Sequence, residues 1–268
     1  MLLQTTKNMV NIATWNVNSI RTRLPHVVEW LQVNPVDVLC LQETKVVDAD
    51  FPRSPFTELG YEIYISGQKS YNGVALISRQ PLKDVSTGFA GILSAVDDWD
   101  EQKRVITGVL DGIRIVNLYV PNGSAVGSEK YVYKLGWLGV LQEYLRVLQK
   151  TTPNICVCGD FNIALEDRDI HDPLSAKNHI MASDAERQAL RDVLELGFAD
   201  AFRKFNSEGG HYTWWDYRTA AFRRNLGWRI DHHYLTSELF ERAQSYTIDV
   251  TPRKLTQPSD HTPAIVQF

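Results

Sequence analysis

Short runs of β-branched and aromatic residues recur along the whole chain, and Gly, Asn or Pro interrupts them. Such runs are typical of strands. Helical patterns separate them: residues 19–32 are amphipathic, residues 129–150 are long and apolar-periodic, and residues 183–197 open on Ser183 with Glu186 three positions later, a capping-box signature. The predicted strands are residues 10–18, 36–44, 61–67, 73–79, 104–110, 113–120, 154–162, 212–217, 228–237, 245–250 and 264–268.

This alternation of helical and strand-like segments predicts the fold class. No glycine fingerprint of a dinucleotide-binding fold follows the first strand, and no linker or repeat divides the chain. Hairpin-like and crossover-like strand pairs occur together, which favours mixed sheets. We therefore predict an α/β (α+β) fold for residues 1–268 as a single domain, with helices on the outer faces of the sheets.

The composition excludes several classes of protein. Hydrophobic residues make up 44% of the chain and charged residues 22%, as in ordinary folded proteins. Cys40, Cys156 and Cys158 have no disulfide-framework spacing, and we predict that Cys156 and Cys158 are buried strand residues in a reducing compartment. The first ten residues lack the apolar segment of a signal peptide. No apolar run approaches the roughly 20 residues that span a bilayer, so we expect a cytoplasmic protein without a membrane partner.

Polar side chains stand at or near the ends of predicted strands, where the runs should be apolar. Residues two apart in a strand point to the same face, so each Asn–Asn or Asp–Asn pair shares one side. Six strand ends that carry carboxylates, amides and an imidazole indicate a single polar site where the strands converge. The residues are Asn16, Asn18, Glu43, Tyr119, Asn122, Asp160, Asn162, Asp231, Asp260 and His261.

These strand ends lie in six motifs: WNVNSIR, LQETK, YVPNG, GDFNIA, RIDHH and SDHTP. In this order, and spread over nearly the whole chain, they resemble the exonuclease III family of apurinic/apyrimidinic endonucleases, part of the endonuclease/exonuclease/phosphatase superfamily. The resemblance implies a four-layered sandwich of two mixed β-sheets packed face to face, with helices on both outer faces. It also implies cleavage of DNA phosphodiesters with Mg²⁺, or Mn²⁺ in its place. One departure is Asn18, where human-type members carry Asp.

Hydrolysis of an anionic phosphodiester requires an activated water, neutralised phosphoryl oxygens and a stabilised leaving oxygen. Mg²⁺ prefers oxygen ligands, so Glu43 is the expected primary ligand, with Asn16 and Asp260 as further candidates. We expect Asp160 to position and deprotonate the water. Asn162 would orient Asp160 or bond the water, while in a two-metal mechanism Asp160 and Asn162 would instead hold a second ion. The residues leave both versions open.

The remaining catalytic candidates act on the phosphate. His261 can donate to a phosphoryl oxygen as negative charge develops there. Asp231 occupies the matching family position for the carboxylate that orients this imidazole. Tyr119 is expected to donate a hydrogen bond from its phenol to the same phosphate, and Lys45 to set the charge beside Glu43.

Residues 203–230 contrast with the formal net charge of −4, because six basic residues there face only two acidic ones, a local balance of +4. The basic residues are Arg203, Lys204, Arg218, Arg223, Arg224 and Arg229. Aromatic residues are interleaved with them, including Trp214, Trp215, Tyr217, Phe222 and Trp228. Arginines bind phosphates without reading sequence, so we interpret Arg218, Arg223, Arg224 and Arg229 as DNA contacts, although a solvated face is the alternative.

The aromatic residues of this segment suggest a pocket for a sugar that lacks its base, because such a sugar leaves the duplex at lower cost than an intact nucleotide. By family correspondence Trp214, Trp228 and Ile230 line the pocket, and Asn122 lies beside it. Trp215 is expected in the core. The alternative for the whole segment is a strand pair that packs its aromatics inward.

Three hypotheses follow. The first is a monomeric nuclease that cuts duplex DNA 5′ to abasic sites, leaves a 3′-hydroxyl and trims or cleans blocked 3′ ends. The second is a superfamily phosphatase acting on a small phosphorylated molecule, which needs a cationic pocket where this chain has tryptophans. The third is a non-catalytic DNA-binding member, against which the intact set of Glu43, Asp160, Asp231 and His261 argues.

Overall fold

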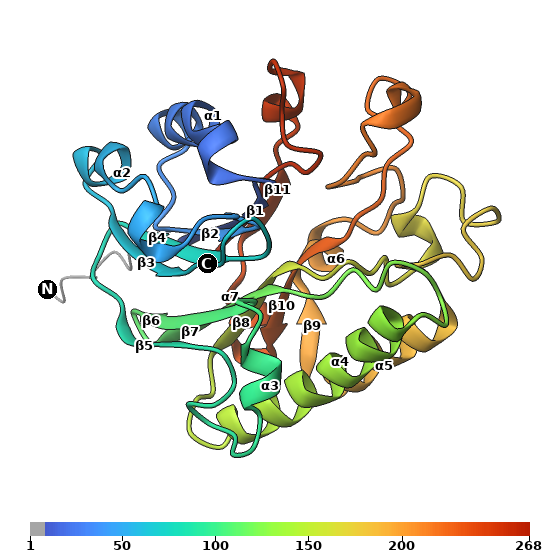
Figure 1. The fold of residues 1–268 in the computed structure, drawn as a ribbon, viewed down its shortest axis with the longest axis horizontal. Coiled ribbons are helices and arrows are strands. Elements are labelled where there is room, and N and C mark those ends of the chain that lie inside the picture. Colours follow the sequence, from blue (N-terminus) through green and yellow to red (C-terminus); the bar gives the residue numbers. More distant parts are fainter. Residues whose placement is uncertain (1–8) are drawn as a thin grey trace, which may run out of the picture.

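The computed structural model describes residues 9–268, which form two six-stranded mixed sheets (Figure 1). The first sheet has the order β11-β12-β1-β2-β4-β3 and the second β5-β6-β7-β8-β10-β9. The strands of the first sheet are β1 (Asn11–Asn16), β2 (Val38–Gln42), β3 (Glu62–Ser66), β4 (Val74–Ser78), β11 (Ser245–Ile248) and β12 (Ala264–Gln267). Those of the second are β5 (Lys83–Thr87), β6 (Val105–Leu110), β7 (Ile113–Tyr119), β8 (Ile155–Asp160), β9 (Phe198–Asp200) and β10 (Asp231–Thr236).

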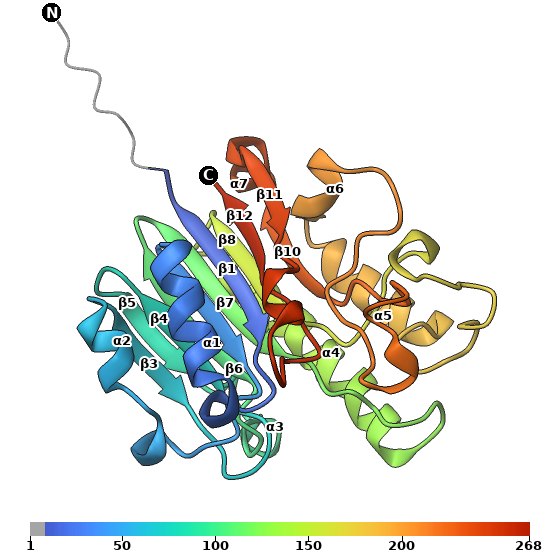
Figure 2. The same ribbon diagram turned by 90° about the horizontal axis from the view of Figure 1, so that it is seen from above.

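Helices cover the outer face of each sheet (Figures 1 and 2). The α-helices are α1 (Ile20–Val33), α2 (Ser54–Glu58), α3 (Asp97–Asp100), α4 (Glu129–Leu148), α5 (Asp184–Leu194), α6 (Ala201–Phe205) and α7 (Ser237–Arg242). Short 3-10 turns are η1 (Asp48–Asp50), η2 (Asp167–Asp169), η3 (Arg218–Ala220) and η4 (Thr251–Lys254). α1 and α2 lie on the first sheet, whereas α4 and α5 lie on the second. The predicted four-layered sandwich is confirmed.

Three apolar clusters fill the three spaces between the four layers. Trp30 of α1 packs with Trp15 of β1 outside the first sheet. Trp137 of α4 packs with strand residues outside the second sheet. Between the sheets, Ile12 of the first sheet shares a cluster with Ile115 of the second. Alternation along each strand produces this division, because successive side chains point to opposite faces.

Each sheet contains one parallel strand pair joined by a helix. β1 runs parallel to β2, with α1 between them in sequence, and β7 runs parallel to β8, with α4 between them. The carboxyl ends of a parallel pair lie at the same edge of the sheet. The chain therefore places Asn16, Glu43, Tyr119 and Asp160 at two such edges, one in each sheet.

Most predicted elements are confirmed, including the helices of residues 19–32, 129–150 and 183–197. The capping box of α5 is formed: Ser183 Oγ accepts from Glu186 N, and Glu186 Oε2 accepts from Ser183 N. The cysteines are buried and free, as predicted for Cys156 and Cys158. β5 and β9 were not predicted, because β5 is half exposed and β9 is only three residues long.

The predicted strand at residues 212–217 is wrong. In this segment Trp214 alone makes bridges, to Trp228 and to His261. The neighbouring tryptophans pack in different clusters, Trp214 with Trp228 and Trp215 with Tyr212. The two tryptophans therefore point to opposite sides, as successive residues of a strand do, but the segment forms no continuous ladder of hydrogen bonds with another strand.

No helix within residues 9–268 is both long and apolar enough to cross a membrane. The prediction that the first ten residues are not a signal peptide falls almost entirely on residues 1–8, which lie outside the described residues.

A buried polar network around Asn117 joins the facing sheets. Asn117 Nδ2 donates to the carbonyls of Leu41 and Ala75, and Gln42 Nε2 donates to Asn117 Oδ1 at 2.7 Å. Replacing Asn117 by Ala would remove all three hydrogen bonds and leave a cavity between the sheets, although Gln42 Nε2 would keep its bonds to Thr14 Oγ1 and to the Cys40 carbonyl.

We expect Asn117→Ala to lower the free energy of unfolding by about 2–4 kcal/mol. Urea denaturation followed by circular dichroism measures the change. The exposed Gln80→Ala serves as control, with an expected change within about 0.5 kcal/mol. An equally small change for Asn117→Ala would show that the network does not hold the sheets together.

Candidate active site

The site lies where the carboxyl edges of the two sheets meet. Asn16 is the last residue of β1, and Glu43 directly follows β2. In the second sheet the register pairs Asp160 with Tyr119 on one side and with Asp231 on the other. Asp231 reaches this edge because β10 is antiparallel to β8 and begins where β8 ends. Strand register thus collects residues that are more than 200 positions apart.

Asn16 joins the carboxylates of the two sheets. Its Nδ2 donates to Glu43 Oε1 and to Asp160 Oδ2, each at 2.8 Å. Its Oδ1 accepts from Asn18 N at 3.0 Å. Lys45 Nζ lies 2.8 Å from Glu43 Oε2 and supplies a compensating charge. Glu43 and Asp160 therefore lie on opposite sides of one amide group, which concentrates negative charge at the junction.

Four residues around this junction have left-handed backbone conformations. Asn18, Glu43, Lys45 and Asn162 have φ of 44°, 52°, 57° and 49°. Non-glycine residues adopt this region at a cost that the surrounding structure must offset. The turns after β1, β2 and β8 thereby aim their side chains into the site.

Asp160 is buried and held by the residue two positions on. Asn162 N donates to Asp160 Oδ1 at 2.8 Å, and Asn162 Nδ2 lies 3.3 Å from Asp160 Oδ2. Burial raises the pKa of Asp160, the charge of His261 opposes this, and Asp231 adds to it, with a result of about 7. A carboxyl with this pKa can exchange a proton near neutral pH.

His261 lies between two carboxylates. Its Nδ1 is 2.9 Å from Asp231 Oδ2, and its Nε2 is 3.7 Å from Asp160 Oδ2. Burial alone would lower the pKa of His261, but the charges of Asp231 and Asp160 outweigh it and raise the pKa to about 10. The imidazole is therefore a cation at neutral pH, oriented by Asp231.

Ser259 fixes the turn that carries His261, and sequence reasoning missed it. Its hydroxyl donates to the carbonyl of Asn16 at 2.7 Å and accepts from His261 N at 3.2 Å. This links the last turn of the chain to the end of β1. The only signal in the sequence was the position of Ser259 directly before the Asp–His pair.

The carboxylate of Asp260 accepts hydrogen bonds from an amide and an indole. Asn18 Nδ2 and Trp214 Nε1 each donate to its carboxylate at 3.0 Å. Asp260 is connected to Glu43 indirectly, because Lys45 Nζ contacts both Asn18 Oδ1 and Glu43. Its expected role as a metal ligand stays a prediction.

Tyr119 closes another side of the site. Burial raises the pKa of its phenol well above the ordinary value, and the charges of Glu43 and Asp160 add to the effect, so Tyr119 is a proton donor at neutral pH. The Arg104 guanidinium lies 4.7 Å from the centre of its ring and donates to its carbonyl. Nothing in the sequence singled out Arg104. Beside Tyr119 lies a pocket of about 410 Å³ whose lining includes Gln68, Tyr71, Arg104, Asn122, Lys130 and Tyr133.

Asn122 and Asn162 contact each other across the ends of β7 and β8. Asn122 Nδ2 donates to Asn162 Oδ1 at 3.0 Å, and Asn162 Nδ2 donates to the carbonyl of Val120 at 3.0 Å. Asn122 thus supports the site beside the second parallel pair.

The three predicted pocket residues come together. The rings of Trp214 and Trp228 meet edge to face with centroids 6.4 Å apart, and Ile230 packs in the same apolar cluster. The rings of His179 and Trp228 also meet edge to face, with their centroids 5.7 Å apart. Trp215 is buried in a separate cluster, as expected for a core residue. Because Trp214 also donates to Asp260, this apolar cluster adjoins the polar site.

The interpretation of Arg229 as a DNA contact is wrong. Its guanidinium is fully buried and pairs with Asp169 at 2.8 Å and Asp200 at 2.7 Å. Arg203 pairs with the same Asp169, and Lys204 donates to backbone carbonyls. The acidic and carbonyl partners of these residues are distant in the sequence, so the sequence alone did not indicate them.

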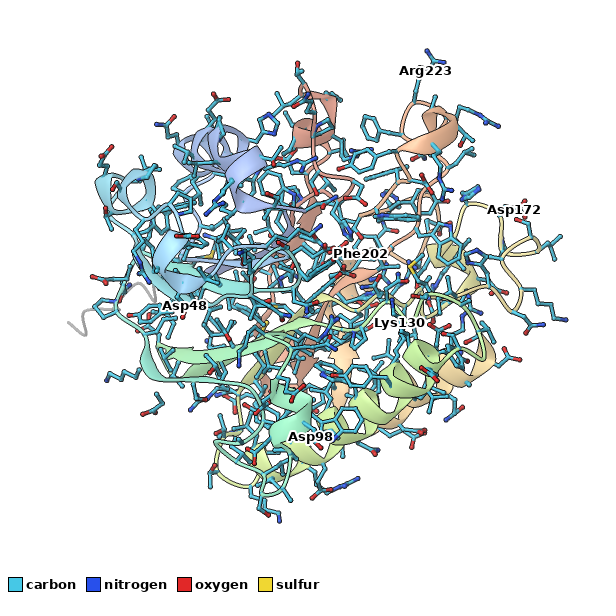
Figure 3. All side chains as sticks on the ribbon, viewed as in Figure 1. Asp48, Asp98, Lys130, Asp172, Phe202 and Arg223 are labelled. Carbon is cyan, nitrogen blue, oxygen red and sulfur yellow. The ribbon has the colours of Figure 1, made fainter. Side chains whose placement is uncertain are left out.

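The other three arginines remain available to a ligand. Arg218 pairs with Asp216, but its side chain is 85% exposed. Arg223 stands at the outer tip of its loop (Figure 3), and Arg224 is exposed beside it. A DNA role for these three stays a prediction.

The donor set fits a hard divalent cation. Ligand atoms of Asp160, Asp231 and His261 lie within 4.8 Å of one another. Glu43 adds a carboxylate that one amide separates from Asp160. Clustered carboxylate oxygens are typical of Mg²⁺ or Mn²⁺ sites, whereas the protonated imidazole of His261 cannot itself bind the ion.

Comparison with known proteins identifies the family of the chain. The chain is 33% identical to an exodeoxyribonuclease of Bacillus subtilis over 95% of this chain and 97% of that protein. It is similar in structure to a variant of the Neisseria 3′ phosphatase NExo bound to a product DNA hairpin, with a TM-score of 0.93, 40% identity, and coverage of 97% and 99%. An AP endonuclease from Archaeoglobus fulgidus has a TM-score of 0.89, 43% identity, and coverage of 96% and 98%. Residues 13–261 match the endonuclease/exonuclease/phosphatase family. The chain therefore belongs to that family, within its exonuclease III group of apurinic/apyrimidinic endonucleases.

Proposed function

We propose that this chain is a monomeric, single-domain DNA-repair nuclease. It hydrolyses the phosphodiester 5′ to abasic sites in duplex DNA, leaves a 3′-hydroxyl, and trims or cleans blocked 3′ ends as a 3′–5′ exonuclease. One observation carries the proposal: Nε2 of a protonated His261 and the carboxyl of Asp160 face each other at 3.7 Å, while Asp231 holds the other side of the imidazole.

In this mechanism Asp160 accepts a proton from the attacking water. With a pKa of about 7 it is substantially ionised at neutral pH and still basic enough to act. His261 donates to a phosphoryl oxygen, whose negative charge grows in the transition state. Tyr119 donates to the same phosphate, and Asn162 orients Asp160.

Glu43 is the proposed main ligand of a divalent cation, with Asn16, Asp160, Asn162 or Asp260 as the further candidates. When bound, Mg²⁺ or Mn²⁺ would neutralise phosphoryl oxygens and stabilise the leaving oxygen. Lys45 supports Glu43 by balancing its charge at 2.8 Å.

The tryptophan pocket selects the substrate. Trp214, Trp228 and Ile230 pack in one apolar cluster that adjoins the polar site through Trp214, and apolar surroundings of this kind suit a sugar that has no base. Double-stranded DNA is the proposed partner, with Arg218, Arg223 and Arg224 as phosphate contacts and Asn122 beside the scissile link.

We expect cleavage of a duplex that contains one tetrahydrofuran abasic analogue, on the 5′ side of the lesion and only with Mg²⁺ or Mn²⁺ present. Denaturing gels measure the product, and a chelator provides the control. An inositol phosphate substrate is tested in parallel by phosphate release. Cleavage of that small substrate without any cutting of the duplex would replace the proposed function by the small-molecule phosphatase.

We expect Asp160→Asn to lower kcat about 10²- to 10⁴-fold, because an amide cannot accept the proton from water. DNA binding, measured by fluorescence anisotropy, is expected to persist within a few fold. A matched loss of binding and turnover would mean that Asp160 holds the substrate and is not the base.

We expect Asp231→Asn to shift the alkaline limb of kcat downward. His261 has a raised pKa, so its charged form is present below that pKa and is lost as pH rises through it. Without the Asp231 charge the pKa falls towards its ordinary value, and activity is lost about one pH unit or more earlier. A kcat profile between pH 6 and 10 tests this, and an unchanged alkaline limb would remove Asp231 from the mechanism.

A further inference from the structure

Lys134 is a buried cation that the mechanism above does not use. It lies in α4 with 0% of its side chain exposed, and its ammonium contacts three oxygens. These are the carbonyl of Asn162 at 2.8 Å, the carbonyl of Asn122 at 3.1 Å and Glu186 Oε1 of α5. An ammonium has three protons to donate, so each one has a partner.

Both carbonyl partners belong to residues of the proposed site. Asn122 follows β7 and Asn162 follows β8, so Lys134 ties together the two loops that leave the second parallel strand pair. The side chains of these residues also meet, because Asn122 Nδ2 donates to Asn162 Oδ1. Asn162 in turn contacts Asp160 through its backbone and side-chain nitrogens. An unbroken series of contacts therefore runs from Lys134 to Asp160.

Glu186 extends the same connection towards the tryptophan pocket. Besides pairing with Lys134, its carboxylate accepts from Met181 N at 3.0 Å and from Ser183 N at 3.1 Å. Met181 packs in the apolar cluster that contains Trp228. The capping box of α5 thus does more than begin a helix, since it orders the segment beside the pocket.

Stability alone is a poor explanation for this pair. A buried ion pair loses much of its attraction to desolvation, and apolar residues of similar volume often replace one at no net cost. An apolar side chain at position 134 would fill the same space against the core. It would not bond two carbonyls on separate loops.

We propose that Lys134 is a positioning residue, which fixes the loops of Asn122 and Asn162 so that Asn162 holds Asp160 in its reactive orientation. This rests on the proposed function, because it assigns Asn162 and Asp160 to the hydrolysis of the phosphodiester. Lys134 acts through these residues and touches no substrate.

The test compares two double variants that remove both charges together. Lys134→Met/Glu186→Gln leaves no donor at position 134. Lys134→Gln/Glu186→Gln puts an amide there, whose nitrogen ends one bond short of the lysine nitrogen and has two protons to donate where the ammonium has three. Each is assayed for kcat and KM on the abasic-analogue duplex with Mg²⁺.

We expect the methionine variant to lose about 10- to 100-fold in kcat, with KM within about threefold of wild type, as for other residues that orient a catalytic group. The glutamine variant should fall between it and wild type, with at least a threefold loss. If near-ultraviolet circular dichroism shows that the methionine variant is unfolded, the kcat of the glutamine variant decides the test. Wild-type kcat in whichever variant decides overturns the proposal.

A control separates positioning from general destabilisation. Leu141→Ala removes a fully buried side chain of the same helix, in the core cluster outside the second sheet. It should lower Tm, yet keep kcat within about twofold at a temperature where it is folded. A kcat loss as large as that of the methionine variant would overturn the proposal. If wild type itself leaves the duplex uncut, the proposed function is wrong. If wild type and the methionine variant cleave the duplex equally well, only the positioning role of Lys134 is wrong.

Discussion

One amide of Asn16 carries the organisation of the site, because it bonds a carboxylate from each sheet. Glu43 follows a strand of the first sheet and Asp160 ends a strand of the second, yet both lie 2.8 Å from the same nitrogen. Two carboxylates held this close repel each other unless a donor, a cation or a proton intervenes. The sandwich supplies such partners in Asn16, Lys45 and His261, and the same charge density suits a divalent ion.

The fold makes this meeting of charges possible through repetition. Each sheet has one parallel pair joined by a helix, and a parallel pair places two carboxyl ends at one edge. Packing the sheets face to face brings the two edges together. Polar residues at these ends then meet without any change to the apolar interior, which explains why a deeply buried core and a charged site share the same strands.

Support for the reactive groups comes from outside the site. Asp231 orients His261, Ser259 ties the last turn to β1, and Arg104 packs on Tyr119. Lys134 and Glu186 add a contact from the outer helices to the loops of the second sheet. The helical layers therefore contribute to stability and also restrict the orientation of the catalytic side chains at the edges of the sheets.

The sequence by itself determined most of the strands, the long helices, the set of polar strand ends and, through six ordered motifs, the family. The periodicity of strands and helices is a local property, and the order of the motifs can be read directly along the chain. Only the tertiary structure decided which charges are paired. Arg229 looked like a phosphate contact until the fold placed it between Asp169 and Asp200. Residues 212–217 likewise resemble a strand in their run of aromatic residues, but the fold gives them no continuous ladder and packs the two adjacent tryptophans in different clusters. Pairing and burial depend on residues distant in sequence, so no local pattern could have revealed Arg104 or Lys134 as supports of the site, and only its position before the Asp–His pair pointed to Ser259.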